Sequence, residues 1–346
     1  MSATVIGVCS KNIINTKQIV ANKEKSMKTV GFIMSSKENE HRRAILPPDI
    51  DSIKNKTFIC IESGYGRNLG YSDDDYRDLG CRILSRDEIL QCDIICDPKV
   101  GDAEYLNKLK NQTVFGWVHA VQNREITNKL ISNKLTAICW EDMFDDERHV
   151  FWRNNEIAGE AAIMHAFQCF GIMPYNTKVA LLGRGNVSNG ALKILTLLGA
   201  DVTVYSRNME HLFKKELSIY DVVVNAILWD TSREDHIIYR KDLREWKKCK
   251  QNCLIIDISC DKNGGIETCV PTTIEKPIYE TEGVLHYAVD HTPSLFYRTT
   301  TISISKSVAK YIDMIIEDKL NDVLINSVEV EKGIIKDKRI IEFQNR

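Results

Sequence analysis

The apolar positions of the chain fall into short runs that alternate with helical patterns, and residues 178–208 show this most clearly. The segment reads KVALLGRGNVSNGALKILTLLGADVTVYSRN. An apolar run at 179–182 is followed by a glycine-rich turn, by apolar residues at helical spacing over 191–198, and by a second apolar run at 202–205. A strand, a glycine turn, a helix and a second strand in this order predict the βαβ unit that binds a dinucleotide.

The glycine turn, GRGNVSNG at 183–190, predicts which backbone groups meet the nucleotide. Gly183 permits the tight turn, and Gly185 allows the backbone to approach a pyrophosphate whose charge suits the amides at the helix start. The alternative is a glycine turn without a ligand. We expect the cofactor to contact this turn and the end of a later apolar run, at Gly183, Arg184, Gly185, Asn186, Val187 and Asn225.

The end of the second strand indicates which dinucleotide binds. NAD-binding units usually carry Asp or Glu here, which bonds the ribose 2′-hydroxyl. This chain has Ser206 and Arg207 instead. A hydroxyl and a guanidinium suit a 2′-phosphate, whereas a carboxylate would repel it. We therefore expect NADPH or NADP rather than NAD as the cofactor, with a solvent-facing Arg207 as the alternative.

The rest of the chain extends the same alternation on both sides of this unit. Strand-like runs separated by short helical patterns predict a parallel sheet between residues 29 and 140, and further apolar runs between 222 and 258 extend the sheet of the nucleotide unit. Long amphipathic helices are predicted over 154–171 and 299–323. The tail from 328 to 343 alternates only weakly, so we expect it to be peripheral.

These elements predict an α/β fold with two Rossmann-like, doubly wound parallel-sheet domains separated by a cleft. We expect residues 27–146 together with 290–346 to form a substrate (catalytic) domain, and residues 147–289 to form an NADP-binding Rossmann domain. Residues 1–26 are polar and lysine-rich and lack the pattern of a signal peptide, so we treat them as a leader of unknown role.

Composition narrows the possible classes of function. The 346-residue chain has a net charge of −2, and it lacks the excess of basic residues that is typical of nucleic-acid-binding proteins. None of its apolar runs reaches the roughly 18 residues that span a bilayer. The 11 cysteines are scattered and often lie in apolar runs, as in a reduced, cytoplasmic protein. The CxxxC pairs Cys92/Cys96 and Cys249/Cys253 lack the spacing of a zinc site, so we expect no metal.

Three polar groups of the first domain follow predicted strands, where α/β sheets build their sites. They are the Arg42/Arg43 loop, Lys99 and His119. Arginine suits bidentate capture of a carboxylate, while a lysine and a histidine divide proton transfers when their pKa values lie near neutrality. Each group also has a structural alternative, because arginine and lysine are usually solvated and histidine often bonds a backbone carbonyl.

The order of motifs resembles the alanine dehydrogenase and lysine-forming saccharopine dehydrogenase superfamily, and within it the N(5)-(carboxyethyl)ornithine synthases. The resemblance covers residues 27 to about 320, and the motifs that carry it are KENEHRRAILP (37–47), ESGYGRNLGYSDDDYRDLGC (62–81), FGWVH (115–119), NEIAGEAA (155–162), LLGRGNVSNGA (181–191), LIIDISCDKNGGIE (254–267), PIYE (277–280) and TPSLFYR (292–298). The last motif and the strand end at Ser206 favour the synthases, whereas Asp290-His291-Thr292-Pro293 is similar to a saccharopine dehydrogenase signature.

The resemblance implies roles for individual residues. Arg42 matches the arginine that binds the substrate carboxylate, Lys99 falls near the catalytic lysine, and His119 matches the catalytic histidine. Asp261, in IDISCDKNGG, matches an active-site aspartate of alanine dehydrogenases. The implied reaction joins the side-chain amine of ornithine or lysine to a 2-oxo acid such as pyruvate, with hydride from NADPH. We expect these small-molecule partners, a homo-oligomer, and no nucleic-acid or membrane partner.

Three alternatives stay open at this point. An alanine dehydrogenase would use ammonia and would prefer NAD. A saccharopine dehydrogenase-like enzyme would join lysine and 2-oxoglutarate, and it would need a second cation for the extra carboxylate. A non-catalytic NADP-binding protein would keep the fold without turnover, which the presence of Arg42, Lys99 and His119 together disfavours.

Overall fold

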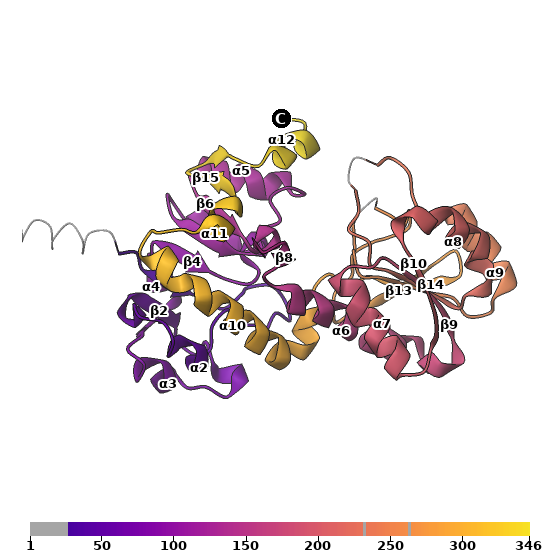
Figure 1. The fold of residues 1–346 in the computed structure, drawn as a ribbon, viewed down its shortest axis with the longest axis horizontal. Coiled ribbons are helices and arrows are strands. Elements are labelled where there is room, and N and C mark those ends of the chain that lie inside the picture. Colours follow the sequence, from indigo (N-terminus) through magenta and orange to yellow (C-terminus); the bar gives the residue numbers. More distant parts are fainter. Residues whose placement is uncertain (1–26, 231–232, 262–263) are drawn as a thin grey trace, which may run out of the picture.

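The molecule has two lobes, each built on one main sheet (Figure 1). The structure is a computed structural model, and it describes residues 27–230, 233–261 and 264–346. The leader expected at residues 1–26 lies outside the described residues. Within these described ranges, no helix combines the length and the apolar character needed to cross a membrane.

The first lobe is built on an eight-stranded sheet in the order β16-β15-β6-β5-β4-β1-β2-β3. The strands are β1 (Val30–Phe32), β2 (Ile59–Glu62), β3 (Arg82–Leu84), β4 (Ile94–Cys96), β5 (Thr113–Gly116), β6 (Thr136–Cys139), β15 (Val328–Glu331) and β16 (Ile334–Ile335). Its helices are α2 (Pro47–Ile50), α3 (Asp73–Arg77), α4 (Arg86–Ile89), α5 (Arg124–Ser132), α11 (Asp322–Asn326) and α12 (Lys338–Gln344). β1 to β6 pair in parallel, as the alternating pattern predicts.

Both faces of this sheet are buried, which makes it doubly wound. Successive residues of β2 enter different cores: Ile59 and Ile61 pack on the side of α10 (Tyr297–Ile316), and Cys60 packs on the other side. The apolar stripe of α10, which includes Ile304 and Val308, covers the first of these faces. Because side chains of a strand alternate between faces, a strand with no polar face must have a core on each side.

The C-terminal tail is not peripheral, so that prediction is wrong. β15 pairs antiparallel with β6, and β16 pairs antiparallel with β15, which extends the sheet by two strands. Val330 and Ile340 are fully buried in the core of the lobe. Because charged residues interrupt the apolar positions of the tail, its local pattern is weak, and its pairing depends on the exposed edge of β6.

The second lobe contains the predicted βαβ unit within a six-stranded sheet in the order β10-β9-β11-β12-β14-β13. The strands are β9 (Lys178–Leu182), β10 (Asp201–Tyr205), β11 (Val222–Asn225), β12 (Leu254–Asp257), β13 (Ile278–Thr281) and β14 (Val284–Tyr287), and the helices are α7 (Asn186–Leu197), α8 (Glu210–Glu216) and α9 (Arg240–Cys249). All neighbours pair in parallel except β13, which runs antiparallel to β14. The predicted α/β fold with two Rossmann-like domains is confirmed.

The long helix α6 (Trp152–Phe170) connects the lobes. A short hairpin, β7 (Phe144–Asp145) and β8 (Arg148–His149), leads into α6, which packs against α7 of the second lobe and against α10 of the first. Figure 1 shows α6 at the waist between the lobes. The chain thus crosses at α6 and returns before α10, as a domain inserted into another would do. The domain limits at 146/147 and 289/290 stay a prediction.

The contact between α6 and α7 depends on two glycines. A Cβ atom on Gly159 would lie 2.0 Å from the carbonyl oxygen of Val187, and one on Gly190 would lie 1.9 Å from that of Glu156. These distances are far below a van der Waals contact, so a larger residue at either position must separate the helices. The start of α7, which carries the glycine turn, is therefore held against the connecting helix.

We expect Gly190→Ala to lower the free energy of unfolding by about 1–3 kcal/mol, because the added methyl group meets rigid backbone. The gain in helix propensity, about 1 kcal/mol, works in the opposite direction and offsets only part of this cost. Gly185→Ala is the matched control, since a Cβ there would meet no atom within 4 Å. Chemical denaturation of both variants measures the difference, and equal stability would show that the helices adjust freely.

Candidate active site

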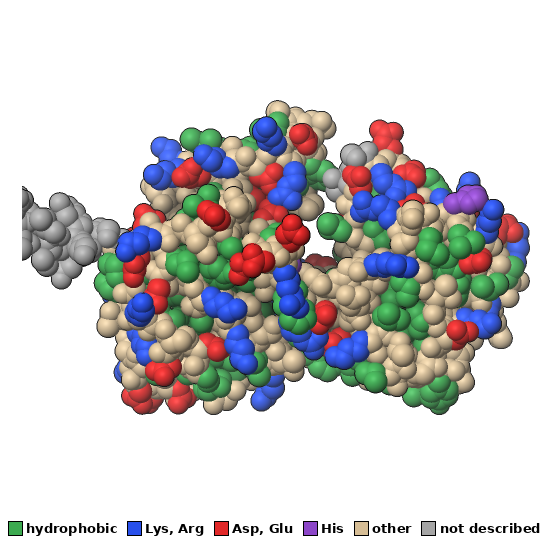
Figure 2. Space-filling model, viewed as in Figure 1, with side chains coloured by type: hydrophobic (Ala, Val, Ile, Leu, Met, Phe, Trp, Pro, Cys, Tyr) green, Lys and Arg blue, Asp and Glu red, His purple; other side chains and the backbone are tan. Residues whose placement is uncertain are grey.

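A cavity of about 820 Å³ lies between the two lobes, and the space-filling view shows the cleft between them (Figure 2). Most of the predicted site residues line it: Lys99, His119, Asp261, Gly183, Arg184, Gly185, Asn186, Val187, Ser206 and Arg207. Arg42 and Asn225 do not. Another cavity, of about 810 Å³, lies at the opposite ends of β4 to β6 and contains none of these residues. The cavity between the lobes is therefore the candidate active site.

The glycine turn after β9 forms the nucleotide side of the cavity. Gly183 has φ +116° and a Cβ there would lie 2.7 Å from the carbonyl oxygen of Ala226, so only glycine fits. Gly185 is the N-cap of α7, no side chain caps this helix, and the space beside Gly185 is open. The free amides of the first turn of α7 therefore face the cleft without a competing side chain. This arrangement fits a pyrophosphate group.

The end of β10, at Ser206, forms the part of the nucleotide side that we expect to contact the adenosine ribose, and we call it the ribose edge. The Ser206 hydroxyl bonds the Asn208 side chain, and the Arg207 guanidinium donates to the carbonyl oxygen of Leu228 at 3.3 Å. Arg207 is exposed, and this long bond holds it close to the cavity. The edge therefore offers one hydroxyl and one cation, as the sequence indicates.

Asn225 and Asp261 lie at different depths on this wall. Asn225 is 2 % exposed and donates to the carboxylate of Asp257 at 2.9 Å. It therefore lies beneath the cavity wall and does not line it. Its predicted contact with the cofactor stays a prediction. Asp261, in contrast, reaches the cavity. Burial raises the pKa of Asp261 to about 6, and the charge of Asp257 adds to this effect. A carboxyl group near neutrality can exchange protons.

The loops that carry Lys99 and His119 form the opposite wall and are tightly interlocked. Lys99 follows β4 and His119 follows β5, the two strands being paired in parallel. The amide of Gly101 donates to the carbonyl oxygen of Trp117 at 3.1 Å, and a Cβ on Gly101 would lie 2.0 Å from the carbonyl oxygen of Val118. The position of one loop therefore fixes the position of the other, and both side chains reach the cavity.

Burial and the charges on this wall lower the pKa values of both side chains. Burial lowers the pKa of Lys99, and the neighbouring charge of Lys37 lowers it further, although its ammonium lies 3.7 Å from the carboxylate of Asp102. The His119 side chain is 45 % exposed to the cleft, and its partial desolvation there lowers its pKa, with the charge of Lys99 as the next cause. His119 is therefore neutral at pH 7, and the lysine releases its proton more readily than a solvated one.

An ion-pair bridge that the sequence analysis missed lies beside them. The ammonium of Lys37 lies 3.1 Å from the carboxylate of Asp102 and 2.8 Å from that of Asp290. Burial works to lower the pKa of Lys37, but the two carboxylates raise it. Asp290 also bonds His291 at 2.6 Å. The signals were present, since Lys37 and Asp290 begin quoted motifs and Asp102 follows Lys99 by three residues, but their meeting requires the folded chain.

Arg42 lies behind the cavity wall in a buried ion pair. It is 2 % exposed, and its guanidinium bonds both oxygens of Glu40 and, at 2.9 Å, the side-chain oxygen of Asn154. Burial works to raise the pKa of Glu40, but Arg42 holds it down, to about 2. Three of the five N–H groups of Arg42 therefore have partners within the protein. Its predicted bond to a substrate carboxylate stays a prediction.

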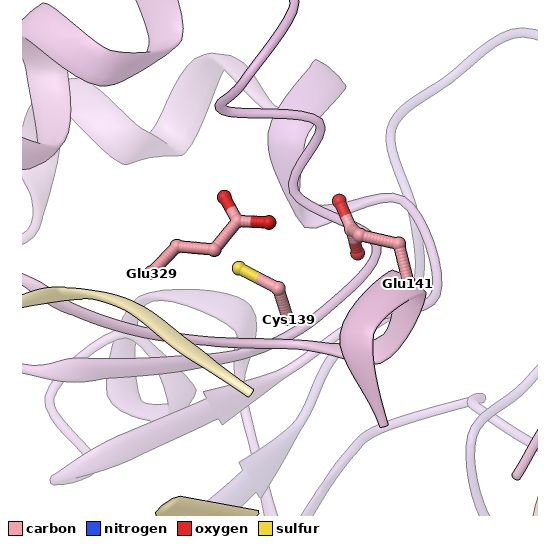
Figure 3. Close-up of side chains that lie close together, drawn as sticks. All are labelled: Cys139, Glu141 and Glu329. Carbon is pink, nitrogen blue, oxygen red and sulfur yellow. The ribbon is translucent and has the colours of Figure 1, made fainter. Parts of the chain in front are cut away.

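Two groups of acidic and thiol side chains have the spacing of metal ligands. Cys139, Glu141 and Glu329 have ligand atoms within 4.8 Å of one another (Figure 3), and so do Asp142, Glu329 and Asp337. The CxxxC pairs of the sequence belong to neither group. The first group lies beside the loop of His119, because the Glu141 carboxylate accepts the His119 amide at 2.5 Å.

The sequence matches two family descriptions: "Alanine dehydrogenase/PNT, N-terminal domain" over residues 33–154 and "Alanine dehydrogenase/PNT, C-terminal domain" over residues 206–342. An N(5)-(carboxyethyl)ornithine synthase from Clostridium botulinum is 33 % identical over 301 residues, which cover 82 % of this chain and 93 % of that one. The same enzyme from Lactococcus lactis is 31 % identical, with coverage of 82 % and 94 %. A solved L-alanine dehydrogenase superposes with a TM-score of 0.75 at 21 % identity, covering 92 % of this chain and 99 % of that one.

The buried pair at Arg42 leads to a stability prediction. Arg42→Met should lower the free energy of unfolding by about 3–5 kcal/mol, because it leaves the Glu40 charge buried without a partner. Adding Glu40→Gln should recover much of this loss, since the uncompensated charge is then gone. Chemical denaturation measures both variants.

Arg67→Met serves as the matched control, because Arg67 is exposed on the same lobe. If Arg42→Met is as stable as Arg67→Met, the pair contributes nothing to the fold and the guanidinium is available to a substrate.

Proposed function

Because the chain belongs to the N(5)-(carboxyethyl)ornithine synthase family, whose two domains are those of alanine dehydrogenase/PNT, we propose that it condenses the side-chain amine of ornithine or lysine with pyruvate and uses NADPH to reduce the product. The family makes the protein an oxidoreductase that binds a nicotinamide cofactor. The observation that carries the proposal is a single cavity lined by the glycine turn, Lys99 and His119.

The proton transfers of this reaction suit the two side chains. The amine nitrogen attacks C2 of the oxo acid and must lose a proton, and neutral His119 can accept it. The carbonyl oxygen gains one proton as the carbinolamine forms, which Lys99 donates readily because its pKa is lowered. It gains a second as water leaves, and His119 can return the proton that it took from the amine. When bound, NADPH supplies the hydride that reduces the resulting imine carbon.

Charged groups around the pair suit substrates that carry both an ammonium and a carboxylate. Asp102 and Asp290 lie on the cavity wall and share the ammonium of Lys37, so a substrate ammonium can replace one of its bonds. Arg42 is the proposed carboxylate clamp, through the N–H groups that Glu40 and Asn154 leave free. Asp261 faces this wall across the cavity as a further proton-exchanging group.

The setting of the reaction is part of the proposal. We place the enzyme in the cytoplasm as a homo-oligomer, without nucleic-acid or membrane partners. The location is supported by the ten cysteines in the described part of the chain, all of which are free thiols.

The reaction can be tested by following NADPH oxidation with ammonia, ornithine and lysine, each combined with pyruvate and with 2-oxoglutarate. We expect the highest kcat/KM for ornithine or lysine with pyruvate. His119→Ala should lower kcat by ~10²–10⁴ while NADPH still binds, because only proton transfer is lost.

His211→Ala is the control, since His211 is an exposed histidine on α8. A preference for ammonia would instead make the protein an alanine dehydrogenase. No turnover with any pair, despite NADPH binding, would favour a non-catalytic NADP-binding protein.

The ribose edge predicts the choice of cofactor. A charge-assisted contact of Arg207 with the 2′-phosphate is worth about 1.5–3 kcal/mol, which corresponds to roughly 10- to 150-fold in affinity. We expect kcat/KM for NADPH to exceed that for NADH by at least ~10-fold.

The double change Ser206→Asp with Arg207→Ile should reverse this order, because the new carboxylate bonds a 2′-hydroxyl and repels a phosphate. Kinetics with both cofactors in both proteins decide the matter. Equal use of NADH and NADPH by the wild type would mean that Arg207 only holds the carbonyl of Leu228.

A further inference from the structure

The loop that carries His119 is held from behind by the carboxylate of Glu141. Glu141 lies in the turn after β6, and its side chain accepts the amides of Val118 at 3.1 Å and of His119 at 2.5 Å. His119 has φ +57°, a left-handed conformation that costs a non-glycine residue free energy. Because the carboxylate satisfies both amides in this conformation, it stabilises the backbone that directs the imidazole into the cavity.

The same carboxylate lies close to the imidazole itself. Its Oε1 atom is 3.8 Å from Nδ1 of His119. This distance is too long for a hydrogen bond, but it places a negative charge beside the ring when the ring takes up a proton. Glu141 is thus related to His119 as an orienting carboxylate is to a catalytic base.

Behind Glu141 lies Glu329, a carboxyl group that has no hydrogen-bond partner in the described part of the chain. Glu329 comes from β15, is 2 % exposed, and points toward Glu141 and Cys139 (Figure 3). The ligand atoms of the three side chains all lie within 4.8 Å of one another. Two buried carboxylates at this distance cannot both ionise without a large cost, so the pair must retain a proton.

Among the described residues, the other groups around Glu329 do not supply a balancing cation. Asp142 and Asp337 also lie within 4.8 Å of it, and Arg339 is engaged by these two carboxylates. The thiol of Cys139 is fully buried, and burial raises its pKa, so it stays neutral. Glu329 therefore faces carboxylates and a thiol.

We propose that Glu141 is a positioning residue for His119, and that the buried Glu329 beside it carries the proton of the pair, so that one negative charge stands behind the imidazole. This role of Glu141 rests on the proposed function, whereas the shared proton does not. The geometry assigns the charge to Glu141, because only this carboxylate accepts backbone amides.

The electrostatics of the pair agree with this assignment. Burial raises the pKa of Glu329 to about 9, with the charges of Glu141 and Asp142 adding to the effect. Burial also raises the pKa of Glu141, to about 7, against the effect of the amides it accepts. On the cavity side, the charges of Lys99 and Lys37 disfavour protonation of the imidazole, and those of Asp102 and Asp290 favour it. Glu141 adds a carboxylate on the opposite side of the ring, 3.8 Å from Nδ1.

Two conservative substitutions separate the two carboxyl groups. Glu141→Gln removes the charge and keeps an oxygen acceptor for the amides. It should lower kcat by ~10–100-fold, leave NADPH binding unchanged, and move the acid limb of the kcat/KM profile to lower pH, because the pKa of Glu141 is raised to about 7 and this titrating carboxyl group is removed. Glu329→Gln mimics a protonated carboxyl group, so it should match the wild type at pH 7. The control is Glu147→Gln at an exposed turn of the same lobe.

The pH dependence of stability gives a second measurement that needs no turnover. The pKa of Glu329 is higher in the folded than in the unfolded chain, so wild-type stability is fully present below the unfolded pKa and is lost as the pH rises toward about 9. The Tm of the wild type should therefore fall relative to that of Glu329→Gln between about pH 5 and 9. Infrared spectra at pH 7 should show the carbonyl stretch of a protonated carboxyl group in the wild type and lack it in Glu329→Gln.

The outcomes that overturn the proposal are distinct from failure of the proposed function. Two results would make Glu329 an ionised metal ligand. One is an infrared difference between wild type and Glu329→Gln that lacks the protonated band. The other is a loss of activity in Glu329→Gln, together with a wild type that a chelator inactivates and a divalent cation restores. An unchanged kcat and pH profile in Glu141→Gln would remove Glu141 as a positioning residue. If His119→Ala is fully active, the function fails, while the infrared band still reports on the proton.

Discussion

The close backbone contact between the loops after β4 and β5 sets the geometry of the whole cleft. Gly101 packs directly on the carbonyl of Val118, and Gly116 lies equally close to the carbonyl of Asp97. No side chain fits at either contact, so the two loops move as one unit. Lys99 and His119 are therefore directed into the same cavity by backbone packing, and their spacing does not depend on a flexible side-chain bond.

Around this unit, positive and negative charges are paired, one pair being buried and the other partly exposed. Lys37 is shared between Asp102 and Asp290, and Arg42 is held by Glu40. A buried ion pair such as Arg42–Glu40 costs desolvation and contributes little net stability, but removing one partner is expensive. Desolvation lowers the pKa values of Lys99 and His119, the charge of Lys37 lowers them further, and the charges of Asp102 and Asp290 oppose this effect.

The lobes have separate tasks that meet only at the cavity. The second lobe presents free helix amides and a cationic ribose edge, and the first lobe presents the groups that exchange protons. The connecting helix α6 packs on α7 through glycines, so the glycine turn is fixed relative to the helix that enters the first lobe. The Lys37–Asp290 bond joins the two parts again at the return crossing. Position is therefore supplied by the fold, and the hydride chemistry by a cofactor.

The sequence by itself determined the local units of this protein. The run from β9 through the glycine turn to β10, the parallel strands and the residues at the strand ends were all readable, because apolar periodicity and glycine turns depend on neighbours only a few residues away. The motif at Ser206 and Arg207 was equally local.

Only the tertiary structure decided which distant groups meet. It paired Lys37 with Asp290 across 253 positions and turned Arg42 toward Glu40 and Asn154. It also brought β15 to the edge of β6 and thereby placed Glu329 behind Glu141. No local pattern records such contacts, because they arise when separate elements share a core and their free energy depends on burial and on the charges that burial brings together.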